Sequence, residues 1–378
     1  MSNAAMRRAW IEVDTRALVR NFLAVRSELS DGCRVLPMVK ADGYGLGARR
    51  VLRALLPEEP WGAGVATAAE GERLRREGWT GRIVVFSSWP PADGGLVIAE
   101  DLEPVVSSCG SLEGYAEAAS RAGVCLPIHV KIDTGMSRFG FPWNDASWVE
   151  ALSRRIEEGR VRVESTLTHF HTADDVEATT EQWRRFGRVL EALRAAGAGP
   201  GLVHAASSTS LARYPEFQAD MVRPGLSLYG GGGPESGSEP VIAVRARVLE
   251  VREVPEGTAV SYGATYRTGT VERLATLAIG YGDGLRRELS NRGRVLLGGG
   301  TAPIRGSVCM DSTIVDVTGL DVGPGDVATL LGSEGEREIR IDEMAALCGT
   351  IDYEILTGWS PRLPRVELGA GTDGGVGA

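Results

Sequence analysis

The sequence predicts an α/β fold in which a (β/α)8 TIM-type barrel is followed by a second, mostly antiparallel β domain. Eight short apolar runs recur through roughly 200 residues, with helical patterns between most of them, as in a barrel of parallel strands. After a stretch rich in glycine and serine at 230–238, short alternating runs replace the helical patterns. The 378 residues leave room for a barrel of ~250 residues and a second module.

The first part of the chain supplies the strands of the predicted barrel. Several of its runs are apolar on both faces, as parallel strands covered by helices are. An open doubly wound sheet is the rival, but no GxGxxG stands between an expected strand and an expected helix. The expected strands are 35–40, 61–66, 82–87, 104–107, 128–133, 165–170, 202–207 and 226–229. The expected helices are 15–29, 111–122, 146–157 and 180–196.

The remainder of the chain has the texture of a β domain. Runs such as AVRARVLEVREV and STIVDVT alternate, and only 341–347 keeps a helical period. The segment 10–13 also alternates, so it can pair with this second domain. We therefore place the barrel at 13–235 and the β domain at 1–12 plus 236–378.

Composition excludes several classes of protein. Hydrophobic residues at 43% and charged residues at 24% exclude a disordered or collagen-like chain. A net charge of −9 argues against a nucleic-acid binder, and the lack of a long apolar window argues against a membrane protein. The N-terminus has no apolar signal core. The odd number of cysteines, without a CxxC pair, predicts reduced thiols in the cytoplasm and no metal site: Cys33, Cys109, Cys125, Cys309 and Cys348.

The expected strand ends carry the chemistry, because active sites of barrels lie at the carboxyl ends of their strands. Lys40 closes the first apolar run, where partial loss of water would lower the pKa of its amine and make it a nucleophile. The alternative is an edge lysine that reaches water. Other polar residues end or enter later runs, so several strands converge on one rim: Lys131, Arg138, His169, His204, Ser208 and Arg223.

Seven motifs in order give the chain a resemblance to a known family. They are VKADGYGLG around Lys40, KIDTGMSRFG around Lys131, RPGLSLYG from Arg223, SYGATY, AIGYGDG, GSVCMD and IDYEILTGWSPRLPRV. The chain resembles the alanine racemase family, whose members combine a barrel with a β domain and use pyridoxal 5'-phosphate. The resemblance covers nearly the whole chain, from about residue 11 to residue 365. It implies interconversion of L- and D-alanine for peptidoglycan precursors.

The resemblance also assigns roles to residues. Lys40 would form the Schiff base with the cofactor, and Lys40 and Tyr262 would be the two bases on opposite faces of the substrate. A tyrosine with a pKa near ~10 needs positive charge nearby for this task. The cofactor would be bound by Lys40, Tyr44, Arg138, His169, Ser208, Arg223, Gly225, Leu226 and Tyr353. The substrate would meet Arg138, Met310, Asp311 and Tyr281, while Lys131, as a carbamate, and His204 would support them.

The resemblance finally implies a head-to-tail homodimer, in which Tyr262 and Met310 enter the site of the partner chain. Departures from the family pattern at Ser207, Leu46 and His171 lie beside the cofactor and leave substrate preference open. The alternatives are a racemase of broader specificity that also takes serine, a decarboxylase of the same barrel type, and a non-catalytic carrier of pyridoxal phosphate. A carrier would have no need of the β domain with its SYGATY motif.

Overall fold

The structure is a computed structural model that describes residues 7–87 and 89–368. The chain divides into two compact units: Phe22–Leu228, and Met1–Asn21 together with Tyr229–Ala378. Helix α1 (Thr15–Ser27) crosses the division between them. Within the described ranges, no helix combines the length and the apolar character that a membrane span requires.

The unit Phe22–Leu228 contains a ring of eight parallel strands, so the predicted barrel is confirmed. Strands β3, β4, β5, β6, β8 and β9 pair in that order, and β10 pairs with β2. Two parallel bridges, Met38 with Gly64 and Ser207 with Arg223, close the ring. The strands are β2 (Arg34–Val35), β3 (Ala63–Val65), β4 (Ile83–Val85), β5 (Glu103–Val106), β6 (Leu126–Asp133), β8 (Val161–Leu167), β9 (Leu202–His204) and β10 (Met221–Val222), and β7 (Phe141–Pro142) adds to β6.

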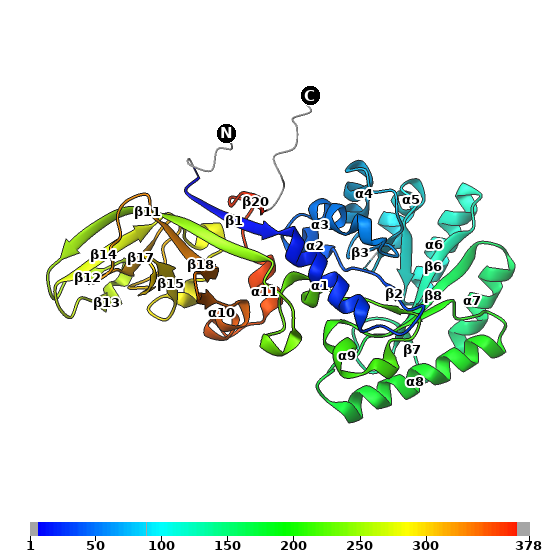
Figure 1. Cartoon of the computed structure of the whole chain (residues 1–378). Coiled ribbons are helices and arrows are strands. Elements are labelled where there is room, and N and C mark those ends of the chain that lie inside the picture. Colours follow the sequence, from blue (N-terminus) through cyan, green and yellow to red (C-terminus); the bar gives the residue numbers. More distant parts are fainter. Residues whose placement is uncertain (1–6, 88, 369–378) are drawn as a thin grey trace. The chain divides into compact units, whose positions relative to one another are not determined.

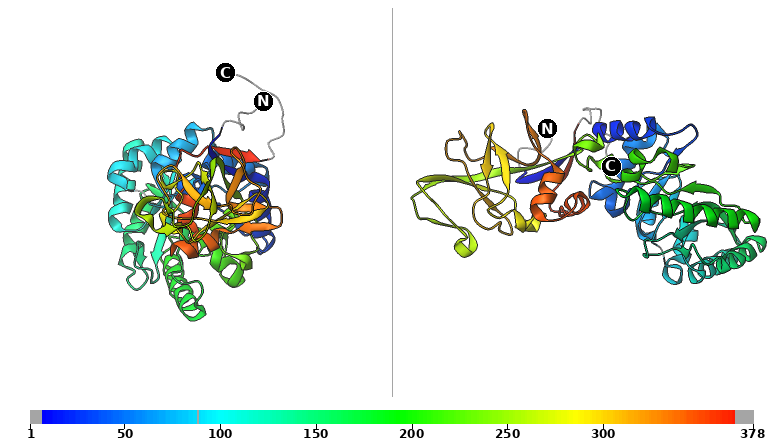
Figure 2. Two further views of the ribbon diagram at one scale, coloured as in Figure 1. Left: turned by 90° about the vertical axis from the view of Figure 1, so that its left-hand side faces the viewer. Right: turned by 90° about the horizontal axis from the view of Figure 1, so that it is seen from below.

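Helices lie outside the strands of this unit (Figure 1 and Figure 2). Their ends follow local chemistry: Ser108 and Ser111 form a capping box at the start of α6, and Gly123 ends it in the left-handed conformation. The four helices expected between and before the strands are found within a few residues of their predicted bounds. Besides α1, they are α2 (Lys40–Tyr44), α3 (Ala48–Leu55), α4 (Ala68–Arg76), α5 (Pro90–Ala99), α6 (Cys109–Ala122), α7 (Ser147–Glu157), α8 (Val176–Ala195) and α9 (Ser208–Arg213).

Two strand predictions were wrong. The run 226–229 is a short 3-10 helix, η4 (Leu226–Tyr229), and the eighth strand is β10, five residues earlier. Its alternation of leucine and tyrosine is typical of a strand, but Pro224 and Gly225 separate it from the ladder. The first run was also predicted too long. Strand β2 ends at Val35, and Lys40 opens the turn α2 instead of closing a strand.

A cluster of apolar side chains fills part of the barrel interior. Leu36, Val84, Val105, Leu167 and Met221 are buried against one another, with Trp61 and Phe86 packed on them. These side chains come from strands or strand ends on several sides of the ring. The barrel is therefore a packed core and not a pore.

The other unit is the predicted β domain. Its nine-stranded sheet follows the order β16-β15-β18-β11-β1-β20, and β14, β17 and β19 join it at the side. All pairs are antiparallel except β1 with β20, and the expected pairing of 10–13 with this domain is confirmed. The strands of this sheet are β1 (Ala9–Asp14), β11 (Ile242–Val254), β14 (Glu272–Leu277), β15 (Arg294–Leu297), β16 (Gly300–Pro303), β17 (Thr313–Asp316), β18 (Val327–Glu334), β19 (Arg337–Ile339) and β20 (Arg365–Leu368). The unit also contains a separate antiparallel pair, β12 (Ala259–Val260) with β13 (Tyr266–Arg267).

Two helices accompany this sheet. Helix α10 (Ile341–Cys348) was predicted, and it ends at Gly349 in the left-handed conformation. Helix α11 (Asp352–Thr357) was missed, because six residues are too few to display a helical period.

Candidate active site

Lys40 stands at the start of a strained turn at the barrel rim. Ala41, Asp42 and Tyr44 all have φ between 52° and 55°, the left-handed region that non-glycine residues rarely adopt. Glu70 holds this turn: its two carboxylate oxygens accept the N–H groups of Ala41 and Ala66, both at 2.7 Å. The turn therefore depends on a carboxylate from α4.

The amine of Lys40 is partly desolvated, although the residue is exposed. This desolvation lowers its pKa, and the positive charges of Arg138 and Arg223 add to the effect, while Glu70 opposes it. A lower pKa leaves more of the amine neutral near pH 7. The direction of this shift is the one expected at the sequence level, and the nucleophilic role of Lys40 stays a prediction.

Four cations act on a single imidazole, that of His169. Burial lowers its pKa well below the usual value, and the charges of Arg223, Lys131, Arg138 and Lys40 lower it further. Lys131 lies on β6, is buried, and has its own pKa lowered by desolvation and then by Arg223 and Arg138. Lys131 and Arg138 both lie over the ring of Phe139, at 5.9 and 5.1 Å from its centre. The structure therefore brings these predicted site residues together into one positively charged cluster.

Arg223 follows β10 and is buried with neutral partners. Its Nη1 donates to Nδ1 of His204 at 2.7 Å. Its Nη2 donates to the carbonyls of Thr168 and Ala205, both at 2.8 Å, and lies 3.4 Å from Nδ1 of His169. Burial lowers the pKa of Arg223 to about 9. Among the described residues Nε makes no hydrogen bond, so its N–H remains for a ligand.

Neutral donors gather where α9 begins. The hydroxyl oxygen of Ser208 accepts the N–H of Gly225 at 3.0 Å and lies within 3.3 Å of both the N–H and the hydroxyl of Ser227. A Cβ at Gly225 would overlap the hydroxyl of Tyr44, so only glycine lets that tyrosine lie here. Leu226 opens η4 beside them. Hydroxyls and backbone N–H groups at one point suit the binding of a phosphate.

Tyr262 belongs to the β unit and sits in another strained turn. Ser261 before it has φ +62°, and Ala264 after it has φ +47°. Ser307 donates to the carbonyl of Tyr262 at 3.0 Å, and Ser261 donates to the carbonyl of Ser307 at 2.6 Å. The Tyr262 side chain is 75% exposed. The backbone is thus fixed while the phenol stands free of its own unit.

The other predicted residues of the β unit lie in two places. Tyr281 donates its N–H to the carbonyl of Cys309, and the next residue donates to the carbonyl of Met310. The carboxylate of Asp311 accepts from Arg362 at 2.7 Å. Tyr353 stands on α11, where burial and then Asp352 raise its pKa. Tyr281, Met310 and Asp311 are therefore neighbours in the turns after β14 and before β17.

Sequence reasoning missed residues that support this site. Glu70 was missed although Thr67 and Glu70 show the T-x-x-E spacing of a capping box, which the structure contains. His129 and Ser165 were also missed. The signal for His129 was its place two residues before Lys131 on one strand, since alternate residues share a face.

The comparisons with known proteins agree on one family. Residues 13–232 match the model "Alanine racemase, N-terminal domain" and residues 241–367 match "Alanine racemase, C-terminal domain". The alanine racemase of Carboxydothermus hydrogenoformans is 39% identical over 376 residues, covering 96% of this chain and 100% of that protein. The alanine racemase of Halothermothrix orenii is 36% identical over 373 residues, with coverage of 97% and 98%.

Solved structures are similar over the same extent. Alanine racemase from Streptomyces coelicolor A3(2) has a TM-score of 0.92 at 33% identity, covering 97% of this chain and 99% of that chain. Alanine racemase from Bartonella henselae, described with covalently bound pyridoxal phosphate, has a TM-score of 0.85 at 29% identity, with coverage of 96% and 100%.

Proposed function

Because this chain belongs to the alanine racemase family, we propose that Lys40 and Tyr262 are the two acid–base groups of its reaction. Its activity is that of an isomerase, the interconversion of L- and D-alanine. The observation that carries the proposal is the desolvated amine of Lys40, with its lowered pKa, beside the buried Arg223. The product would be D-alanine for peptidoglycan precursors in the cytoplasm, and the five free cysteines support a reducing compartment.

Pyridoxal 5'-phosphate is the cofactor that these residues fit. An amine of lowered pKa suits an aldehyde, which bonds only to the neutral form. The free Nε–H of Arg223 suits a ring nitrogen, and the donors at Ser208 suit a phosphate. The positively charged cluster around His169 suits a group with several negative charges. The chemistry supplied by the bound cofactor is withdrawal of the electron pair left on the α-carbon when its proton departs.

We assign the residues that hold the cofactor as follows. Lys40 would bond its aldehyde carbon with loss of water, Arg223 would meet the ring nitrogen, and His169 and Arg138 would lie beside it. The residues that would hold the phosphate are Tyr44, Ser208, Gly225, Leu226 and Tyr353. His204 orients Arg223 through the 2.7 Å hydrogen bond.

Each of the two acid–base groups transfers one proton, on opposite faces of the α-carbon. Once the amino group of alanine has displaced the amine of Lys40 from the cofactor, that amine would take the proton from the α-carbon in one direction. The hydroxyl of Tyr262 would then return a proton to the other face. The reverse reaction exchanges these tasks, so both enantiomers are made at one site. Arg138 and Met310 bind the carboxylate of alanine, while Tyr281 and Asp311 line the entrance.

Exposure of the β-unit side chains supports a site shared between two chains. Tyr262 is 75% exposed, Met310 52% and Tyr281 43%. Large side chains so open to water are typical of surfaces that a partner covers. We infer a head-to-tail homodimer in which Tyr262 and Met310 of each protomer complete the site around Lys40 of its partner.

Subunit complementation tests both the bases and the dimer. Lys40→Ala and Tyr262→Phe proteins are each expected to be inactive. Mixing them after dissociation should restore about a quarter of wild-type activity, because half of the dimers are mixed and each mixed dimer has one intact site. The racemisation is followed by deuterium incorporation at the α-carbon in heavy water.

The control is a mixture of Lys40→Ala protein with the double variant Lys40→Ala, Tyr262→Phe, which has no intact site in any combination. If the first mixture stays as inactive as this control, although native mass spectrometry shows mixed dimers, the shared site is excluded. If Tyr262→Phe alone keeps full turnover, the tyrosine is not a base.

A further inference from the structure

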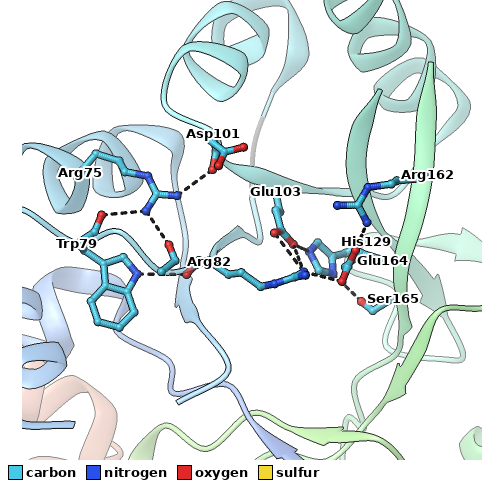
Figure 3. A network of polar contacts seen from close by, with 10 residues as sticks. Arg75, Trp79, Arg82, Asp101, Glu103, His129, Arg162, Glu164 and Ser165 are labelled. Carbon is cyan, nitrogen blue, oxygen red and sulfur yellow. Dashed lines mark hydrogen bonds and ion pairs between the residues drawn. The ribbon is translucent and has the colours of Figure 1, made fainter. Parts of the chain in front are cut away.

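A buried hydrogen-bonded chain crosses the interior of the barrel and ends on Arg223. His204 Nε2 lies 2.8 Å from the hydroxyl oxygen of Ser165, which lies 2.6 Å from Nδ1 of His129. His129 Nε2 lies 3.0 Å from Oε2 of Glu103 (Figure 3). With the bond from Arg223 to His204, four hydrogen bonds link five buried residues.

The hydrogen-bonded chain passes from one strand to the next along the inner face of the barrel. Glu103 opens β5, His129 lies on β6, Ser165 on β8, His204 ends β9 and Arg223 follows β10. These strands are consecutive neighbours in the sheet, and His129 is paired directly with Ser165. The chain therefore climbs from the amino-terminal end of the strands to the end where Lys40 and Arg223 stand.

The groups at the two ends set the directions of the end hydrogen bonds. Arg223 can only donate, so Nδ1 of His204 accepts and its Nε2–H donates to Ser165. A carboxylate at Glu103 can only accept, so Nε2–H of His129 donates to it, and the arrangement we infer has Nδ1 of His129 accepting from the hydroxyl of Ser165. Both imidazoles are then neutral Nε2–H tautomers, and all donors point toward Glu103.

The Glu103 end is a balanced cluster of charges. Arg82 contacts Glu103 at 3.3 Å and Glu164 at 2.5 Å, and Arg162 also pairs with Glu164. Figure 3 shows these side chains together beside His129. Glu103 is the carboxylate of this cluster that contacts His129, so it is the acceptor that ends the chain.

At the other end, Arg223 is a buried cation without an ion pair among the described residues. Burial of an uncompensated charge is costly, and hydrogen bonds in a chain polarise one another. A chain that ends on a carboxylate makes His204 a better acceptor than an isolated imidazole would be. It holds the plane of the guanidinium, and with it the direction of Nε–H.

We propose that Glu103, His129 and Ser165 are positioning residues for the racemase reaction, which act through His204 to orient Arg223. The inference rests on the role proposed above for Arg223 at the cofactor. It extends the functional machinery of the barrel to its amino-terminal end, far along the strands from the reacting atoms.

The first test reads the tautomers directly and needs no turnover. The protein has four histidines, so solid-state ¹⁵N NMR of the full-length, histidine-labelled protein gives a simple spectrum. His129→Gln and His204→Gln spectra assign the two rings. We expect both to be Nε2–H tautomers near neutral pH. A Nδ1–H tautomer or a charged ring at either position overturns the proposal.

The second test compares two carboxylates that share Arg82. Glu103→Gln replaces the acceptor by an amide that can donate or accept, so His129 should become a mixture of tautomers. We expect kcat to fall on the order of tenfold while KM for alanine stays within about twofold. Glu164→Gln removes the other partner of Arg82 without touching His129, and should leave the tautomers and kcat unchanged.

A third variant covers the case in which Glu103→Gln does not fold. Ser165→Ala cuts the chain in its middle, and Thr166→Val is its control, because Thr166 is a buried hydroxyl on the same strand that donates to the carbonyl of Pro200. A fall in kcat in Ser165→Ala alone supports the proposal. Equal kcat in both members of each pair overturns it. A wild-type protein that does not racemise alanine overturns the proposed function instead, whatever the tautomers are.

Discussion

Glu70 offers a sharp test of how the catalytic lysine is held. Its two carboxylate oxygens serve different partners: Oε1 accepts from Ala41 and Oε2 accepts from Ala66. In Glu70→Gln one oxygen becomes an NH2 group, which cannot accept. One of these two N–H groups therefore faces a donor, which weakens the link between the turn that carries Lys40 and the start of α4.

The magnitude follows from the turn and its two bonds. Each non-glycine residue in the left-handed region costs roughly 1 kcal/mol or more, and the turn contains Ala41, Asp42 and Tyr44 in that region. A hydrogen bond to a charged group contributes about 1.5–3 kcal/mol. Losing one such bond should lower the free energy of unfolding by about 2 kcal/mol, which is about 4–8 °C in Tm for a unit of this size. We expect kcat to fall on the order of tenfold.

The matched control is Glu72→Gln on the same helix. Glu72 pairs with Arg76 at 3.3 Å on the surface, so its loss should change stability by less than about 0.5 kcal/mol. Thermal unfolding and the rate of alanine racemisation are measured for both variants. The charge of Glu70 raises the pKa of Lys40, so removing that charge lowers the pKa further. A fall in kcat in Glu70→Gln would therefore not come from greater protonation of the amine. If the two variants melt and turn over alike, the turn does not depend on Glu70.

Three further outcomes are expected. Gly225→Ala places a methyl group against the hydroxyl of Tyr44. The Kd for pyridoxal phosphate, measured by absorbance titration, should therefore rise at least about tenfold. An unchanged Kd would exclude the proposed phosphate site at Gly225, Tyr44 and Ser208. Burial, and next Arg223, lower the pKa of His204 in the folded state, so the unfolded chain binds more protons below about pH 6.5. The free energy of unfolding, measured with urea, should therefore fall as the pH drops from about 7.5 to 5.5, and it should fall less in His204→Gln. The same dependence on pH in both proteins would contradict this. Desolvation lowers the pKa of Lys131, which favours the neutral amine that adds CO2, releases a proton and becomes a carbamate. Intact-protein mass spectra near neutral pH should show the added mass and lose it in Lys131→Met, and a spectrum without it argues against the modification.

The architecture could be predicted from the sequence because it depends on local periodicity. The helix 180–196 was expected from its apolar spacing, and α8 buries the same positions. The eighth strand could not be predicted, since Met221–Val222 is too short to display alternation. Its place in the barrel depends on its pairing with β2, which is a long-range contact.

The residues of the candidate site could be predicted where they belong to sequence motifs. They could not be predicted where their role depends on tertiary contacts. The quoted motifs contain Lys40, Lys131, Arg138 and Arg223, and the structure gathers these residues around His169. Left-handed backbone at Ala41 could not be inferred, because alanine has no preference for it. That conformation is stabilised by Glu70, from another helix, which accepts the N–H.

Apolar side chains beside the polar chain explain why it can act at a distance. Strands β5, β6, β8 and β9 contribute the polar chain, and the buried apolar cluster comes from β2, β4, β5, β8 and β10 or their ends. The ring of Trp61 meets that of His129 edge-on at 6.2 Å, so apolar surface borders the chain directly. In such surroundings each hydrogen bond is stronger than in water, and an unpaired donor is more costly. The charges at Arg223 and Glu103 can therefore fix the tautomers between them, an arrangement that no single strand reveals.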